Sequence, residues 1–367
     1  MKTYIKILIT LAIGLTALGF SLAVTGINVA LSGEKGILKY VNLIENVLYG
    51  ENSEMPENLC LIDVSYDRTM VPVVDHFGMP LGTTDITDRA KLYNLLSNLN
   101  NDRNYRYILL DVFFDSEIQT PDDSALFALI SQMPSIIVPT HLGERIAEGI
   151  SPDKTALSDY VTTADDDFIK YPAAIDGNKT IAVKMYEDCT GNKVKRRNIF
   201  PDLRIHNIQM YDKDLNKNIL TLGTDMAEVI DSGLLDEFTE DKFIIIGSFY
   251  NDDIHNTFRG NMPGPLIHFN VFDAMMRGTH RLTFIQIVLL FIIFCILGAT
   301  CVWDVNPVSH RHRFLRFLLS LLTYSAFLSV VCIIWFYCFH SVIDIILTAI
   351  LFEGIKFLLN LNNKTYA

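Results

Sequence analysis

The sequence of 367 residues has few cysteines outside its long apolar runs. Four of its six cysteines lie in such runs, so only Cys60 and Cys189 remain for a soluble part. This distribution excludes a disulfide-rich scaffold and a zinc site built from a cysteine cluster. Cys60 and Cys189 could pair in an oxidising compartment, and the sequence leaves that question open.

Basic residues are also scarce between residues 26 and 280, where 39 acidic and 22 basic side chains give a net charge of −17. Proteins that bind nucleic acid need a basic surface to contact phosphates. The acidic balance therefore excludes nucleic acid as a partner of this part of the chain.

Three common chemical motifs are missing from the sequence. It lacks the Gly-x-Gly-x-x-Gly spacing of a phosphate-binding turn, the Gly-x-Ser-x-Gly elbow of a hydrolase and the loop of an EF-hand. These motifs therefore give no support for a phosphate cradle, a hydrolase nucleophile or an EF-hand calcium site.

Long apolar runs are what the sequence does have. Uncharged runs of 27, 22 and 27 residues follow Lys6, Arg281 and Arg316. Each is longer than the roughly 20 residues that span a bilayer core. A fourth run, residues 341–359, contains charged residues and is a weaker candidate. We predict an α-helical bundle in the lipid bilayer, with one N-terminal and three C-terminal spans.

The orientation of these spans follows from short basic flanks, because Lys and Arg are retained on the cytoplasmic side. Lys2 and Lys6 precede the first run, and the basic loop 309–316 joins the second and third runs. We predict a multi-pass protein of the cytoplasmic (inner) membrane, with both termini in the cytoplasm and residues 28–281 outside. The first span could also be a cleaved signal peptide, although its length favours an anchor.

The predicted domains are an anchor over residues 1–33, an extracytoplasmic domain over 34–280 and three spans over 281–367. In the middle domain, strand-like runs alternate with helical patterns, which is typical of an α/β fold with a mainly parallel sheet. The expected strands are 59–64, 107–114, 135–138, 205–211 and 243–247. The expected helices include 90–99, 224–238 and 264–278. Residues 141–200 are expected to leave the sheet, with hairpin material near 180–186.

Several motifs in this domain occur in a characteristic order. The stretches 243–248, 253–257, 262–264 and 267–270 contain Ile-Ile-Ile-Gly-Ser, Asp-Ile-His-Asn-Thr, Met-Pro-Gly and Ile-His-Phe-Asn. Earlier come Asp63 with Ser65, then Arg89, residues 110–115 and Asp123. Over residues 36–280 the chain resembles the type-two CHASE domain, an extracytoplasmic sensory domain associated with cyclases and histidine kinases.

The resemblance implies a layout of one span, the sensory domain, three spans and a cytoplasmic output domain. The sequence has the first three parts and stops after the last span. We therefore expect a separately encoded signalling or effector protein to supply the output. The resemblance also implies a homo-oligomer, most simply a dimer.

Candidate ligand-binding residues lie where two predicted strands end. Asp63 and Asp111 close their strands, and Asp67 and Asp115 follow each by four residues. Ligands of open parallel sheets bind beyond the carboxyl ends of the strands, so the four carboxylates could share one crevice. They would suit a hard metal cation or a cationic small ligand, and the sequence does not specify a metal. The alternative is that they brace loops and helix ends.

Asp253 and His255 form a second candidate pair, in the loop after the strand that ends at Gly247. Such a pair could contribute to ligand binding, acid–base chemistry or pH sensing. The alternative is again that the two side chains brace the loop.

Candidate partner contacts lie in the membrane part. Arg311, Arg313 and Arg316 could bind an effector or anionic lipid, or could only set the topology. Glu353 is an ionisable residue inside a predicted span, where such groups are costly and often functional. Its alternative role is an ion pair with Lys356 one turn further on.

These observations and the family resemblance predict a membrane-anchored sensory or adaptor subunit that passes a signal to a separate protein. We expect it not to be an enzyme and to have no catalytic residues and no cofactor. Two alternatives stay open, namely a structural scaffold of a membrane complex and an extracytoplasmic metal-dependent hydrolase that uses Asp63 and Asp111.

Overall fold

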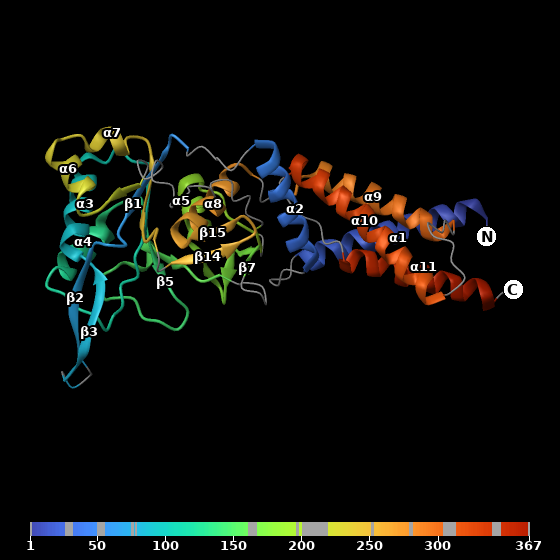
Figure 1. The fold of residues 1–367 in the computed structure, drawn as a ribbon, viewed down its shortest axis with the longest axis horizontal. Coiled ribbons are helices and arrows are strands. Elements are labelled where there is room, and N and C mark those ends of the chain that lie inside the picture. The colour runs from blue at the N-terminus through green and yellow to red at the C-terminus, as the bar shows by residue number, and fades with distance from the viewer. Residues whose placement is uncertain are drawn as a thin grey trace. The chain divides into compact units, whose positions relative to one another are not determined.

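The structure is a computed structural model, and it describes residues 2–25, 32–49, 56–74, 77, 79–160, 167–195, 198–199, 219–250, 253–278, 282–303, 313–339 and 346–365. The chain divides into two compact units, one formed by Met1–Leu48 with Gly278–Ala367 and the other by Tyr49–Arg277. Figure 1 shows the elements of both units.

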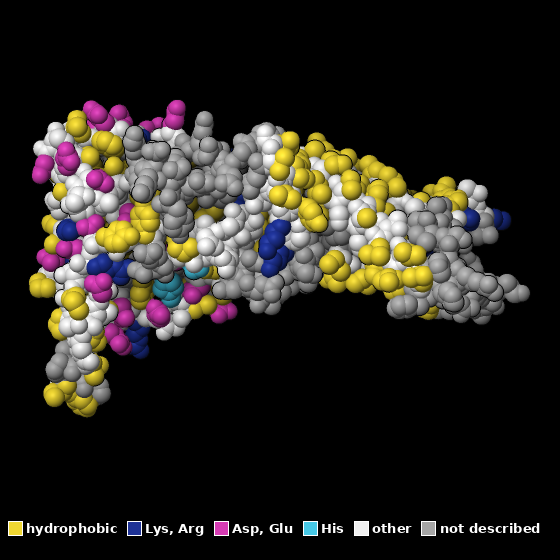
Figure 2. Space-filling model, viewed as in Figure 1, with side chains coloured by type: hydrophobic (Ala, Val, Ile, Leu, Met, Phe, Trp, Pro, Cys, Tyr) yellow, Lys and Arg dark blue, Asp and Glu magenta, His cyan; other side chains and the backbone are white. Residues whose placement is uncertain are grey.

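The first unit is helical. Its helices are α1 (Thr3–Thr25), α2 (Ser32–Tyr49), α9 (Phe284–Val302), α10 (Arg313–Phe339) and α11 (Ile346–Thr365). Three segments are long and apolar enough to cross a membrane, namely Thr3–Val24, Phe284–Val302 and Phe317–Phe339. On the face shown in Figure 2, many hydrophobic side chains are exposed on these helices. The fourth predicted span is helical as α11, but it is outside that group and stays a prediction.

Small residues bring α1 and α9 close together. A Cβ atom added at Gly14 would lie 3.2 Å from the backbone nitrogen of Cys295, and one at Gly298 would lie 3.4 Å from the carbonyl oxygen of Thr10. Ala17 and Ser21, two more small residues of α1, are both buried. Close backbone approach of this kind is a common way to pack helices in a membrane.

The second unit is built on a six-stranded sheet with the order β12-β1-β13-β4-β5-β6, and every neighbouring pair in it is parallel. This confirms the predicted α/β fold with a mainly parallel sheet. The strands are β1 (Leu59–Asp63), β4 (Tyr107–Asp111), β5 (Ile136–Thr140), β6 (Thr155–Leu157), β12 (Ile219–Thr221) and β13 (Phe243–Gly247).

Helices cover both faces of the sheet, which explains why its central strands are apolar up to their carboxyl ends, where β1 and β4 finish in Asp63 and Asp111. One face packs against α3 (Arg89–Asp102), α4 (Asp123–Gln132), α6 (Asp225–Asp231) and α7 (Leu235–Thr239). The other face packs against α5 (Ile181–Thr190) and α8 (Gly264–Met276). On that side Phe243 of β13 meets Phe272 of α8 with ring centroids 5.0 Å apart.

Short strands form the remaining sheets of the unit. They are the hairpin β2 (Arg68–Val74) and β3 (Pro80–Thr87), the sheet of β7 (Asp167–Phe168), β14 (Ile254–Thr257) and β15 (Gly260–Pro263), and the pairs β8 (Tyr171–Pro172) with β11 (Asn198–Ile199) and β9 (Ala174–Ile175) with β10 (Asn178–Lys179). A 3-10 turn, η1, covers Pro152–Lys154.

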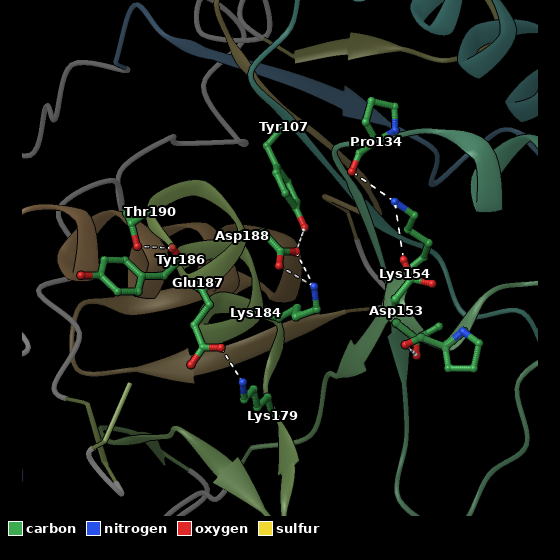
Figure 3. Close-up of polar contacts among 12 residues, drawn as sticks. Tyr107, Pro134, Asp153, Lys154, Lys179, Lys184, Tyr186, Glu187, Asp188 and Thr190 are labelled. Atoms are coloured by element: carbon green, nitrogen blue, oxygen red, sulfur yellow. Dashed lines mark hydrogen bonds and ion pairs between the residues drawn. The ribbon is translucent and has the colours of Figure 1, made fainter. Parts of the chain in front are cut away.

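The hairpin predicted near residues 180–186 is wrong, because these residues begin helix α5. Ile181 and Val183 are β-branched and favour a strand locally, but burial on the sheet decides the outcome. Figure 3 shows how the helix is held there. Asp188 accepts hydrogen bonds from the Tyr107 hydroxyl at 2.7 Å and from Lys184 Nζ at 2.5 Å.

Other expectations are corrected in detail. The helix predicted over 224–238 is two helices, α6 and α7, separated by a turn that contains Gly233 with φ 71°. Residues 141–200 do not leave the sheet entirely, because β6 forms its edge beside β5. The strand predicted over 205–211 lies outside the described residues. Cys60 and Cys189 are both free thiols, so the possible disulfide between them is not formed.

Candidate functional site

Three strand ends lie side by side at the carboxyl edge of the sheet. Asp63 of β1 is paired in register with Gly247 of β13, which is paired with Asp111 of β4. By the alternation of side chains along a strand, all three residues lie on the face of the sheet that packs against α5 and α8. Their neighbours Ile62, Leu110 and Ile246 lie on the opposite face, in the core with α3, α4 and α6. This edge is where ligands of open parallel sheets bind.

Asp63 braces the loops around it. Its Oδ1 accepts hydrogen bonds from the Ser65 hydroxyl at 2.6 Å and the Phe249 backbone N–H at 3.0 Å. The side chain is 1% exposed, and its Oδ2 has no hydrogen-bond partner among the described residues. Burial and these bonds fit the loop-bracing alternative for Asp63.

Asp67 is similarly engaged. Its Oδ1 lies 2.6 Å from Lys91 Nζ, and its Oδ2 accepts the Gly223 backbone N–H at 2.8 Å. The hydrogen bond to Asp67 raises the pKa of Lys91. Asp67 thus ties the start of β2 to α3 and to the loop after β12.

The four predicted carboxylates do not share one crevice. Helix α8 packs its first turn onto Gly247, where an added Cβ would lie 3.1 Å from Cβ of Pro265 and 3.2 Å from Cβ of Asp111. Pro265 therefore occupies the space above Gly247, between the side chains of Asp63 and Asp111. Asp115 lies in the loop after β4, where its Oδ1 accepts the Glu117 backbone N–H at 2.8 Å.

A cavity of about 190 Å³ opens near the start of α8. Its walls come from the segments that follow β5 and β6, from β14 and the residue before it, and from the first turns of α8. The lining residues are His141, Ser158, Asp159, Tyr160, Asp253, His255, Gly264, Ile267 and His268. Figure 2 shows histidine side chains that reach the surface of this unit near acidic ones.

Asp253 and His255, the second candidate pair, are hydrogen-bonded to each other in this cavity. Nε2 of His255 lies 2.7 Å from Oδ1 of Asp253, and its Nδ1 is hydrogen-bonded to the Tyr160 hydroxyl. The Asp253 backbone oxygen accepts the N–H of Gly264 at 2.8 Å, and the carboxylate lies against Gly264, where an added Cβ would come within 2.8 Å of Oδ1. A negative side chain at this position suits the positive end of helix α8.

Asp111 lies beside this pair and interacts with it electrostatically. Its side chain is half-buried. Burial and the nearby charge of Asp253 both raise the pKa of Asp111 well above its ordinary value. Two carboxyl groups that disfavour joint ionisation are a frequent feature of functional sites.

His268 forms the inner wall of the cavity and is 3% exposed. Its Nδ1 lies 2.7 Å from the Tyr171 hydroxyl and its Nε2 lies 3.0 Å from the Ser158 hydroxyl. Burial lowers the pKa of His268 from 6.5 to about 4, so the ring is neutral near pH 7.

The structure thus brings Asp111, Asp253 and His255 together and places Asp63, Asp67 and Asp115 elsewhere. Sequence reasoning missed the residues of the cavity that follow β5 and β6, because residues 141–200 carry no clear periodic pattern. His268 lies within the motif 267–270, but its partners Tyr171 and Ser158 are distant in the sequence. Only the fold reveals that it lines the cavity.

The predicted partner contacts are placed in part. Arg311 lies outside the described residues, and Arg313 and Arg316 belong to α10 without described side chains. Glu353 is 5% exposed and accepts a hydrogen bond from the Ser320 hydroxyl. Lys356 Nζ lies 3.4 Å from the same hydroxyl, so these two α11 residues meet at Ser320.

Within the described ranges, no group of three His, Cys, Asp or Glu side chains is arranged to hold a metal ion. A family model described as the CHASE2 domain matches residues 83–302, which is more than half of the chain. The chain belongs to the CHASE2 family. Neither the comparison with curated proteins nor the comparison with solved structures gave a match.

The CHASE2 match confirms the resemblance drawn from the sequence motifs. It begins within β3 and ends with α9, so it includes the cavity and one candidate span. CHASE2 is an extracytoplasmic sensory domain, and the apolar helices make this protein a membrane protein.

Proposed function

We propose that this CHASE2 protein is a membrane-anchored sensory or adaptor subunit that passes an extracytoplasmic signal to a separate partner protein. The observation that carries the proposal is the cavity of about 190 Å³ beside α8. Gly264, Ile267 and His268 of α8 line it. Only residues 277–283 separate the end of α8 from the start of α9, a candidate span.

Signal transfer then follows from differential binding. A ligand shifts a conformational equilibrium only by contacting the two states differently. A ligand in this cavity contacts α8 on one side and the Asp253–His255 pair on the other. It would thereby change the position of α8 relative to the loops, and the connection 277–283 would carry that change to α9.

We propose that the protein is not an enzyme, although Ser158 and His268 have the spacing of a nucleophile and its base. A general base works best when its pKa is near the operating pH. The pKa of His268 is about 4, which makes the ring a weak base at neutral pH. The ring is also oriented by the Tyr171 hydroxyl, where a catalytic triad has a carboxylate.

For the topology we propose that the N-terminus is cytoplasmic, that residues 28–281 are outside the inner membrane and that α11 returns the chain to the cytoplasm. Lys2, Lys6 and the basic residues of 309–316 support this orientation. A fluorescent protein that folds only in the cytoplasm, fused after residue 367, should fluoresce. If that fusion is dark and a phosphatase fused at the same position is active, the C-terminus lies outside and α11 does not span the membrane.

The partner can be sought directly with the full-length protein. A mild-detergent pull-down followed by mass spectrometry should recover a cytoplasmic effector together with oligomers of this chain. A triple variant of Arg311, Arg313 and Arg316 to Gln, and separately Glu353→Gln, should reduce that recovery, whereas the control Lys364→Gln should not. Recovery of this chain alone, as a defined oligomer, would contradict transfer to a partner.

A structural scaffold is the second candidate, and the hairpin β2–β3 favours it. In Figure 1 the hairpin extends away from the six-stranded sheet of its unit. Met70 is 70% exposed and Leu81 is 69% exposed on it. Exposed apolar side chains on a projecting hairpin are available for contact with another protein. A scaffold should keep its complexes when Asp253 is replaced by Asn, whereas a sensor should lose its response.

A further inference from the structure

We propose that the cavity beside α8 binds a small organic cation with N–H donors, such as a primary ammonium compound. This rests on the proposed function, because it takes the cavity to be the ligand site of the sensor. Three properties of the cavity carry the inference: its size, its charge and its balance of hydrogen-bond donors and acceptors.

The size limits the ligand to a small molecule. The cavity of about 190 Å³ is smaller than the roughly 300–1,000 Å³ of pockets that hold drug-sized ligands. It therefore suits a small molecule of a few non-hydrogen atoms better than a nucleotide.

The charge of the lining favours a cation. Asp159 and Asp253 contribute two carboxylates, and the described lining residues include no Lys or Arg. Asp111 is not counted among these charges, because burial and Asp253 raise its pKa and so disfavour its ionised form. His268 is neutral near pH 7 because of its burial and does not offset these charges.

The donors of the cavity are largely used within the protein. Both ring nitrogens of His255 are engaged, one by Asp253 and one by Tyr160. Both ring nitrogens of His268 are engaged as well, by Tyr171 and Ser158. An anionic or purely accepting ligand would therefore find few donors to bind it.

Acceptors, in contrast, are in surplus. An ionised carboxylate offers about four lone-pair positions. Asp159 uses Oδ2 to accept the Leu142 backbone N–H at 2.9 Å, and its Oδ1 lies 3.7 Å from Nδ1 of His141. Asp253 uses Oδ1 for His255. Both side chains are about one third exposed, so their unused positions can accept hydrogen bonds from a positively charged ligand that displaces water.

The test compares three probes of similar shape by calorimetry on the full-length protein in detergent: n-propylammonium, 1-propanol and propionate. Propylammonium should bind, and the other two should bind at least about tenfold more weakly, as expected for a charged hydrogen bond. Asp253→Asn and Asp159→Asn should each weaken propylammonium binding about tenfold. Asp231→Asn, an exposed control on α6, should leave it unchanged.

Several outcomes would overturn the proposal. They are no propylammonium binding, equal binding of propanol or propionate, or binding that both cavity variants leave unchanged. Zn²⁺ and Ca²⁺ are titrated in parallel. If propylammonium fails to bind and a metal ion binds in a way that Asp253→Asn abolishes, the ligand of the cavity is a metal ion and the proposal of an organic cation is wrong. Protease sensitivity is measured with and without propylammonium. Binding without any change in sensitivity would support the cation and contradict the sensory function.

Discussion

Tyr171 and His268 are joined by a 2.7 Å hydrogen bond between the phenol oxygen and Nδ1, although 97 positions separate them in the sequence. Tyr171 is fully buried, and the bond ties the short strand β8 to helix α8. The Ser158 hydroxyl holds the opposite ring nitrogen at 3.0 Å. His268 is therefore fixed as a neutral ring at the wall of the cavity.

This burial predicts acid sensitivity. The pKa of His268 is about 4 in the folded protein, against 6.5 ordinarily. Between these values the unfolded chain binds a proton that the folded chain does not, so the free energy of unfolding should fall as pH drops from 6.5 towards 4. The full loss is about 3 kcal/mol. Thermal unfolding of the full-length protein at a series of pH values measures it.

His268→Gln supplies the control for that prediction. The variant should be less stable at neutral pH, because its buried partners lose a well-fitted ring, but its stability should depend less on pH in the same window. An unchanged pH dependence in the variant would assign the acid sensitivity to other groups.

A second prediction concerns Asp111, whose pKa is raised by burial and by the charge of Asp253. Because the pKa of Asp111 is higher in the folded than in the unfolded protein, the free energy of unfolding falls as pH rises from the unfolded pKa through the folded one. Burying Asp111 therefore lowers the stability of the protein at neutral pH. Asp111→Asn should raise the neutral-pH unfolding midpoint by about 2–4 °C, equivalent to about 1 kcal/mol. Asp115→Asn, four residues on, should leave the midpoint unchanged. A lower midpoint for Asp111→Asn would show that its carboxylate makes a net favourable contact.

A third prediction tests the attachment of α5 to the sheet (Figure 3). Tyr107 is 3% exposed and donates to Asp188 at 2.7 Å. Tyr107→Phe keeps the ring and removes a hydrogen bond to a charged acceptor, at a cost of about 2 kcal/mol. Denaturant unfolding should show this loss, whereas Tyr93→Phe, at an exposed position, should change little. Equal effects of both variants would mean that the bond adds no stability.

The sheet was predictable from the sequence because its strands are continuous apolar runs bounded by polar residues. Residues 59–63, 107–111 and 243–247 need no distant partner to be recognised. Helix α5 was not, because Ile181 and Val183 favour a strand locally and only packing on the sheet selects the helix. The short edge strands β6 and β12 have too few residues to show an alternation.

The candidate site was predictable only where its residues lie close in sequence. Asp253 and His255 are two residues apart, so they could be named as a candidate pair, and the structure joins them by a hydrogen bond. The position of Asp111 at a strand end was also foreseen, but its separation from Asp63 arises because β13 lies between β1 and β4, with Pro265 packed on Gly247. Such contacts between distant segments leave no local pattern in a single sequence.

A last prediction concerns the packing of α1 on α9. An added Cβ at Gly14 would lie 3.2 Å from the backbone nitrogen and 3.3 Å from the Cα of Cys295, so backbone atoms would have to move. Gly14→Ala should therefore destabilise the helical unit by about 1–3 kcal/mol, the usual cost of overpacking. Gly19→Ala is the matched control in the same helix, since an added Cβ there has no atom within 4 Å among the described residues. Thermal unfolding in detergent should separate the two variants. If both behaved alike, the close approach of α1 to α9 would not contribute to stability, and the small residues of α1 would reflect only the composition of a membrane helix.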